Sequence, residues 1–264
     1  MRRGVAGAVL TAVIALLSGC RTPSDETLAR LFFARNARGS LLLSAVKGSA
    51  EYRVNNSRLE TRFPPDALYF MPETLIALEA GAVPDADALE SWDGEDRGLA
   101  EWNRDQSLKT AFHWSCDWFF DRIAARTEAR VTARHLKAMQ FGNADIGNNQ
   151  ADFPSNGTLA VSSEELARFL KALYRESLPI RREYQQQLKQ MMHLRDSPRG
   201  GAVYGKTAWT PDSPARHAWF VGFVESRVKG AWVFVLNLTV EHPADTAFRQ
   251  EIVFDALKEK GIFP

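Results

Sequence analysis

Serine and lysine residues three positions apart are the first place to look for acyl-transfer chemistry in this sequence. A serine hydroxyl is a weak nucleophile and needs an adjacent base, which a lysine one helical turn away can provide. The pattern occurs at Ser44–Lys47 and at Ser226–Lys229. The first pair lies in a predicted strand, where positions i and i+3 face opposite sides, and the second lies in a predicted hairpin turn. Neither pair opens an apolar helix, so we expect neither to be catalytic.

Metal and redox chemistry have little support in the sequence. There are only two cysteines, Cys20 and Cys116, and the five histidines lack the spacing of a zinc site. We expect Cys116 to be a buried thiol without an intramolecular partner. No cofactor or metal is predicted. The formal net charge of +1 gives no reason to expect binding of nucleic acid.

The N-terminal stretch MRRGVAGAVLTAVIALLSGC has the pattern of an export signal, with two arginines, an uncharged apolar run and small residues before Cys20. It is similar to the bacterial lipobox. That resemblance implies cleavage before Cys20, lipid on its thiol and a membrane anchor; a plain secretory signal with an incidental cysteine is the alternative. Arg21 stands where aspartate would favour inner-membrane retention, so the resemblance favours the outer membrane, facing the periplasm.

The composition, 45% hydrophobic and 25% charged, is that of a globular protein. The helices and strands of the remaining chain are predicted from the spacing of its hydrophobic residues. We expect a signal peptide over 1–19 and a tether with a short helix over 20–38. A hairpin around Lys47 should follow. Helices are then predicted over 63–80, 108–125, 162–176, 183–194 and 246–261, and three strands before the last helix. This order predicts an α/β (α+β) fold over 39–264, an antiparallel sheet flanked by helices, with a helical subdomain at about 84–195.

The stretch FPPDALYFMPETLIALEAGAV, residues 63–83, predicts a buried helix with Asp66 as its N-cap. With other stretches in the same order, it resembles the class D serine β-lactamases, or oxacillinases, and the penicillin-recognising domain of β-lactam sensors. The resemblance covers about 39–263 and implies a β-lactamase/transpeptidase-like fold with a five-stranded sheet. The other stretches are SWDGEDRGLAEWNRDQSLKTAFHWSC, FGNADIG, YGKTAW, AWFVGFVE and FRQEIVFDALKEKGI.

In that family a serine at the head of the long helix attacks the β-lactam carbonyl, and a carboxylated lysine one turn later acts as the base. The family motif falls here on Ala67 and Phe70. Alanine has no nucleophile, and phenylalanine has no amine. The resemblance therefore implies a degenerate member without the Ser-x-x-Lys motif.

Other family positions also differ. The valine beside the lysine is Asp117, which would repel a carbamate. The tryptophan that bonds the carbamate aligns with Pro154, which has no N–H donor. Phe141 replaces the tyrosine of a Tyr-Gly-Asn motif, and Ala208 replaces the glycine of Lys-Thr-Gly, where a methyl group would crowd the ligand.

Six positions retain the residue that the resemblance associates with ligand binding. The arginine among them would hold a carboxylate, for which its forked guanidinium is well suited. The six are Ser115, Asn143, Lys206, Thr207, Trp209 and Arg249.

Three functions are compatible with this pattern. The first is a non-hydrolytic binding or scaffolding lipoprotein, with a peptidoglycan fragment or an envelope protein as partner. The second is a sensor that binds β-lactams or peptidoglycan without a covalent bond. The third is a β-lactamase or transpeptidase with another nucleophile, for which Ser115 beside Lys206 is the pair to consider.

Overall fold

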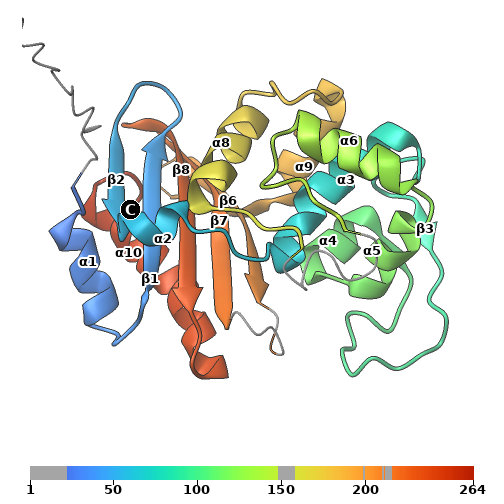
Figure 1. The fold of residues 1–264 in the computed structure, drawn as a ribbon, viewed down its shortest axis with the longest axis horizontal. Coiled ribbons are helices and arrows are strands. Elements are labelled where there is room, and N and C mark those ends of the chain that lie inside the picture. The colour runs from blue at the N-terminus through green and yellow to red at the C-terminus, as the bar shows by residue number, and fades with distance from the viewer. Residues whose placement is uncertain (1–22, 148–157, 199, 210, 212–215) are drawn as a thin grey trace, which may run out of the picture.

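The fold is built on a six-stranded antiparallel sheet (Figure 1), in a computed structural model that describes residues 23–147, 158–198, 200–209, 211 and 216–264. The strand order is β2-β1-β8-β7-β6-β5. Its strands are β1 (Gly39–Ala45), β2 (Glu51–Val54), β5 (His193–Asp196), β6 (Gly201–Trp209), β7 (His217–Ser226) and β8 (Gly230–Thr239). Two short strands, β3 (Leu89–Glu90) and β4 (Gln106–Ser107), pair separately.

The first and last helices cover one face of the sheet (Figure 1). They are α1 (Glu26–Phe33) and α10 (Phe248–Glu259), and a 3-10 turn, η2 (Pro243–Ala247), leads into the latter. Leu28 and Val253 pack there against Phe220 and Leu236 from the sheet. Removal of these apolar side chains from water holds the two helices on the sheet.

The second face carries a larger apolar core that continues into a helical lobe. Helix α3 runs through this lobe and is buried along most of its length, in contact with α5, α6 and α9. Such a helix shows no polar stripe because every side meets protein. The elements here are α2 (Asn56–Glu60), η1 (Asp66–Tyr69), α3 (Phe70–Ala80), α4 (Leu108–Trp114), α5 (Asp117–Ala124), α6 (Ala129–Ala138), α8 (Ser163–Tyr174) and α9 (Arg182–Met191).

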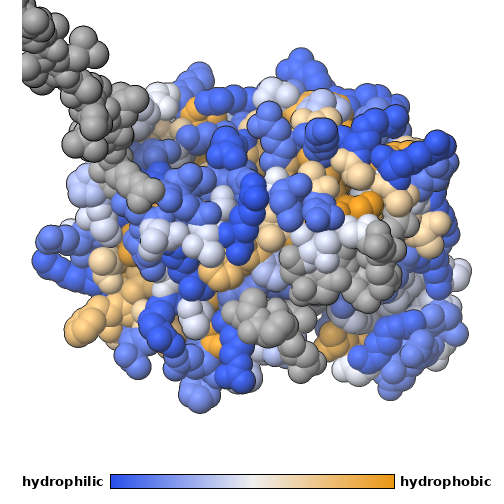
Figure 2. All heavy atoms as spheres, viewed as in Figure 1, coloured by the Kyte–Doolittle hydropathy of each residue, from blue (hydrophilic) through white to orange (hydrophobic). Residues whose placement is uncertain are grey.

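The surface in the same view is mostly hydrophilic, with apolar side chains scattered singly or in small groups (Figure 2). No helix within the described ranges is both long enough and apolar enough to span a bilayer. Those ranges also hold no group of three or more histidine, cysteine or acidic side chains placed to bind a metal ion.

The mixed α/β fold with an antiparallel sheet is confirmed, and three details differ from expectation. The sheet has six strands instead of five, because His193–Asp196 leaves the end of the predicted 183–194 helix and pairs with β6. The 108–125 segment forms two helices, because Ser115 adopts a left-handed conformation (φ 51°) between them. The 63–80 helix begins as the 3-10 turn η1, and α3 itself starts at Phe70.

Candidate functional site

The head of α3 lies beside strand β6, where the family motif places its chemistry. Ala67 sits in η1, half-buried, and η1 packs against β6. The chain enters this turn through an antiparallel bridge between Phe63 and Val161. Ala67 offers only a methyl group, so this residue of η1 has no hydroxyl to attack a carbonyl.

Phe70, on which the resemblance places the family lysine position, is 8% exposed. Its ring stacks on that of Phe120 from α5, with centroids 3.8 Å apart and planes 4° apart. This stack joins α3 to α5 through an apolar contact. The space in which a carboxylated lysine would stand therefore holds two aromatic rings.

Lys206 is the only lysine among the described residues whose ammonium is this deeply buried, with 6% of the residue exposed. Its Nζ donates to the carbonyl of Phe112 at 2.5 Å and to the hydroxyl of Ser115. The amine also lies 4.7 Å from the centroid of the Phe112 ring and 5.8 Å from that of Phe70. Burial lowers the lysine pKa to about 7, and the Asp117 carboxylate partly opposes this shift. The structure thus brings Ser115 and Lys206 together, with a lysine that is partly neutral at neutral pH.

Acidic side chains from α3 and α5 interact with one another, and one of them interacts with this lysine. Glu73 is buried, and loss of hydration, with the nearby Asp121 and Asp117, raises its pKa well above the usual value. Desolvation also raises the Asp117 pKa, to about 6, with Asp121 adding to the shift and Lys206 opposing it. Asp117 nevertheless keeps an exposed surface, so water screens part of this effect. The sequence analysis singled out Asp117 but missed Glu73. An acidic residue within a strongly apolar predicted helix could have indicated a buried carboxyl group at Glu73.

Asp66 is not the N-cap that the sequence suggests. It has a left-handed backbone (φ 49°), and no side chain caps either η1 or α3. Its carboxylate lies instead 3.5 Å from Nε2 of His217, and both side chains are buried. The carbonyl of Pro64 lies 2.9 Å from the same Nε2 and accepts a hydrogen bond from the indole of Trp219 at 2.9 Å. Burial lowers the His217 pKa to about 4, so this imidazole is neutral at neutral pH.

Three more predicted ligand residues lie along β6 and α10. Lys206 and Ala208 face the helical lobe, and by strand alternation Thr207 and Trp209 face the other side, where Thr207 is opposite Phe220 in register. Arg249 donates to the carbonyls of Ala208 (3.1 Å) and Thr246 (2.7 Å). Burial lowers the pKa of this guanidinium to about 10. The arginine thus braces the end of β6, and a carboxylate-binding role for it stays a prediction.

Asn143 joins its own loop to residues 158–160. Its amide donates to the carbonyl of Thr158 at 2.8 Å, and its side-chain oxygen accepts from the backbone N–H of Ala160 at 3.0 Å. A ligand role for Asn143 also stays a prediction. Pro154 and Cys20, for which the sequence suggests a lost tryptophan and a lipid, fall outside the described residues.

The cavity at Lys206 and Thr207 is small, at about 90 Å³. Pockets for drug-sized ligands usually enclose roughly 300–1,000 Å³. The residues lining it are Phe112, His113, Met191, Leu194, Gly205, Lys206, Thr207, Phe220 and Gln250. The enclosed space is therefore smaller than that of a typical ligand pocket.

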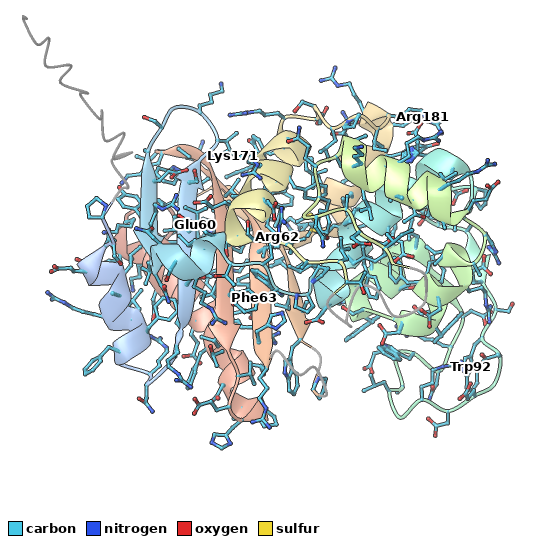
Figure 3. The ribbon with its side chains drawn as sticks, viewed as in Figure 1. Glu60, Arg62, Phe63, Trp92, Lys171 and Arg181 are labelled. Atoms are coloured by element: carbon cyan, nitrogen blue, oxygen red, sulfur yellow. The ribbon has the colours of Figure 1, made fainter. Side chains whose placement is uncertain are left out.

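A second serine–lysine contact lies elsewhere. Ser44, which the sequence pairs with Lys47, instead accepts a hydrogen bond from Lys171 of α8 at 2.6 Å and donates to Glu51 at 2.6 Å. Figure 3 shows Lys171 on α8, apart from Phe63 at the entry to η1. Ser44 is buried, so this network joins α8 to the β1–β2 hairpin and presents no accessible hydroxyl.

Comparison with known proteins agrees with this geometry. Residues 33–258 match the family described as penicillin binding protein transpeptidase domain. The β-lactamase OXA-2 of Salmonella typhimurium is 35% identical over 200 residues, which cover 76% of this chain and 70% of that protein. The chain belongs to the class D β-lactamase-like family of penicillin-binding transpeptidase domains.

Solved class D β-lactamases share the whole fold. The FUS-1 (OXA-85) enzyme of Fusobacterium nucleatum subsp. polymorphum superposes with a TM-score of 0.87 at 25% identity, covering 92% of this chain and 100% of that one. The class D enzyme YbXI from Nostoc gives a TM-score of 0.85 at 27% identity, covering 89% and 99% of the two chains. This class D-like domain thus keeps the family frame around Ala67 and Phe70.

Proposed function

We propose that this class D-like protein is a non-hydrolytic binding or scaffolding module of the bacterial envelope. One observation supports the proposal above all: a methyl group and a stacked phenyl ring occupy the two positions where the family has a hydroxyl and an amine. Catalysis by acyl transfer needs both a nucleophile and an adjacent base. The protein would present its fold to a peptidoglycan fragment or an envelope partner and form no acyl-enzyme.

The proposal includes an anchor at Cys20, on the outer membrane and facing the periplasm. The export signal and the lipobox-like end of its apolar run support this placement. Cell fractionation of the full chain, with Cys20→Ser as the control, tests it. Lipid labelling and membrane recovery should both require the Cys20 thiol.

Covalent chemistry is tested with a fluorescent penicillin and with nitrocefin. The full chain should take up no covalent label and should hydrolyse no nitrocefin above background, while OXA-2 under the same conditions does both. Stoichiometric labelling of this protein would refute the proposal.

A second candidate function rests on the contact between Ser115 and Lys206. A buried lysine with a pKa of about 7 is partly neutral and could accept a proton from the serine hydroxyl that it touches. In that case the protein would be an acyl-transfer enzyme with Ser115 as its nucleophile. Ser115→Ala would then abolish turnover and labelling, whereas unchanged turnover in that variant excludes Ser115.

Noncovalent recognition is the remaining alternative, and Lys206, Thr207 and Arg249 are the residues that motivate it. Isothermal titration calorimetry with ampicillin measures it directly. Heat of binding that disappears in Arg249→Ala would support a sensor role, and no binding at millimolar ligand removes it.

A further inference from the structure

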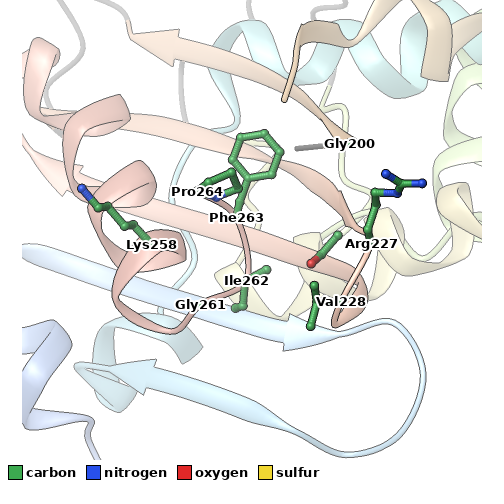
Figure 4. Close-up of a pocket in the computed structure, with 9 residues that line it drawn as sticks. Gly200, Arg227, Val228, Lys258, Gly261, Ile262, Phe263 and Pro264 are labelled. Carbon is green, nitrogen blue, oxygen red and sulfur yellow. The ribbon is translucent and has the colours of Figure 1, made fainter. Parts of the chain in front are cut away.

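A basic and apolar surface lies far from the head of α3, at the joint between the β7–β8 turn and the end of α10. A groove there encloses about 420 Å³. Figure 4 shows the ring of Phe263 within it, with Lys258 on one side and Arg227 on the other. The residues that line it are Gly200, Ser226, Arg227, Val228, Lys258, Gly261, Ile262, Phe263 and Pro264.

The turn beside this groove exposes an apolar side chain between two cations. Val228 is 89% exposed and lies between Arg227 and Lys229 at the tip of the hairpin. Apolar side chains that enter the bilayer interface and basic side chains attracted to anionic lipid both contribute to binding at a membrane surface. The acidic Glu259 beside Lys258 reduces the positive charge of this surface but does not cancel it.

The same surface adjoins the point where the chain enters the fold. Lys260 forms an ion pair with Asp25 at 2.6 Å, and the backbone carbonyl of Lys260 accepts a hydrogen bond from Nζ of Lys229, also at 2.6 Å. Asp25 caps α1, so the turn and the end of α10 are joined to the first described helix.

Chain length then limits how far this surface can stand from a lipid on Cys20. Cys20 and Asp25 are five residues apart, and an extended chain of that length spans at most about 18 Å. A tether this short raises the effective concentration of the surface at the bilayer, so a weak contact is sufficient to orient the domain.

We infer that the turn 226–230 and the end of α10 form a membrane-contact surface that rests on anionic lipid, with Val228 at the bilayer interface. The inference rests on the proposed anchor at Cys20. It fixes the orientation of the domain, since β3 lies at the opposite end of the molecule from α1 (Figure 1) and would face away from the membrane.

The test places an environment-sensitive fluorophore at Val228→Cys in the full chain. Leu89→Cys on β3, 71% exposed, is the matched control at the opposite end. Cys116 is buried, and burial raises its thiol pKa to about 11, so it should not take the label at neutral pH. The unsubstituted chain reports any label on Cys20.

In vesicles of phosphatidylethanolamine and phosphatidylglycerol, brominated lipid should quench the Val228 probe at least about threefold more than the Leu89 probe. Pure phosphatidylcholine vesicles should remove the difference. Arg227→Gln with Lys258→Gln should weaken the contact by about fivefold for each cation removed.

The outcomes separate the surface from the anchor. If the protein is anchored and both probes stay in water, the inference is overturned and the anchor stands. If the protein is not anchored but the Val228 probe responds to added anionic vesicles, the surface is supported and the anchor is rejected. If neither occurs, both are rejected.

Discussion

The ring of Phe70 lies flat against the ring of Phe120, with 3.8 Å between the centroids and 4° between the planes. One ring comes from the first residue of α3 and the other from α5, so the pair joins these helices at the position that the resemblance assigns to the family lysine. Lys206, 5.8 Å from the Phe70 ring centroid, bonds instead to Phe112 and Ser115. Phe70 is therefore part of the core.

Truncation of this stack should cost stability. Phe70→Ala and Phe120→Ala should each lower the free energy of unfolding by about 3–5 kcal/mol, because each removes a buried ring and leaves a cavity. The double variant should show a coupling of about 0.5–1.5 kcal/mol, the usual size for an aromatic pair. Urea unfolding followed by circular dichroism measures all three. Phe33→Ala, at a residue 89% exposed, is the control and should change stability by less than about 0.5 kcal/mol.

Restoring the two missing groups should not restore the enzyme. Ala67→Ser with Phe70→Lys would place an amine against Phe120, which lies one turn of α5 from Asp117, and the Ala208 methyl group would remain. An acid beside the new lysine opposes its carboxylation. Nitrocefin turnover should stay roughly a thousandfold below that of OXA-2, since catalysis depends on correctly placed groups more than on their presence. Efficient hydrolysis would show that these neighbours matter little.

The parts of this fold that are local in the sequence could be predicted. Helical spacing of apolar residues marks α3, and Ser162 with Glu165 marks the start of α8, where both capping bonds are present. The strand β5 could not be predicted, because His193–Asp196 is exposed, has one apolar residue among four and becomes a strand only by pairing with β6. The end of α4 at Ser115 could not be predicted either, because no glycine or proline marks it in the sequence.

Contacts between residues far apart in the sequence could be predicted only from the family resemblance. Ser115 and Lys206 are 91 positions apart, and periodicity does not relate them. The resemblance placed both at one pocket, and the structure brings them into contact. It carried no information on Phe70 and Phe120, because the family has a lysine at the first position.

Glu73 should destabilise the fold as the pH rises. Its folded pKa is raised by burial, so the native state holds a proton that the unfolded state releases above about pH 4.3. The unfolded state therefore gains stability relative to the native state from that pH upward. Glu73→Gln keeps the shape and removes the titration, so at neutral pH it should be more stable than the unsubstituted protein by roughly 1–3 kcal/mol.

Urea unfolding at about pH 4 and pH 7 tests this for Glu73→Gln. The advantage of the glutamine should shrink at the lower pH, where the glutamate is protonated in both states. Glu79→Gln, at a partly exposed acid on the same helix, is the matched control and should show a smaller difference. A Glu73→Gln variant that is equally stable, or less stable, at both pH values would contradict the argument.

Lys206 should have the opposite effect, because its folded pKa of about 7 lies below that of an unfolded lysine at about 10.4. Between these values the unfolded state binds more protons than the native state, so the free energy of unfolding rises with pH across this window. Lys206→Met removes the titration and leaves an apolar stem of similar length beside Phe70 and Phe112. The stability of the unsubstituted protein relative to Lys206→Met should increase by roughly 2 kcal/mol from about pH 7.5 to pH 9.5.

Denaturant unfolding at both pH values provides the measurement, and Lys109→Met, at an exposed lysine, should show no such trend. If the free energies of unfolding of the unsubstituted protein and Lys206→Met change with pH in parallel, Lys206 keeps an ordinary pKa. Lys206 would then be protonated at neutral pH and could not act as a base for Ser115.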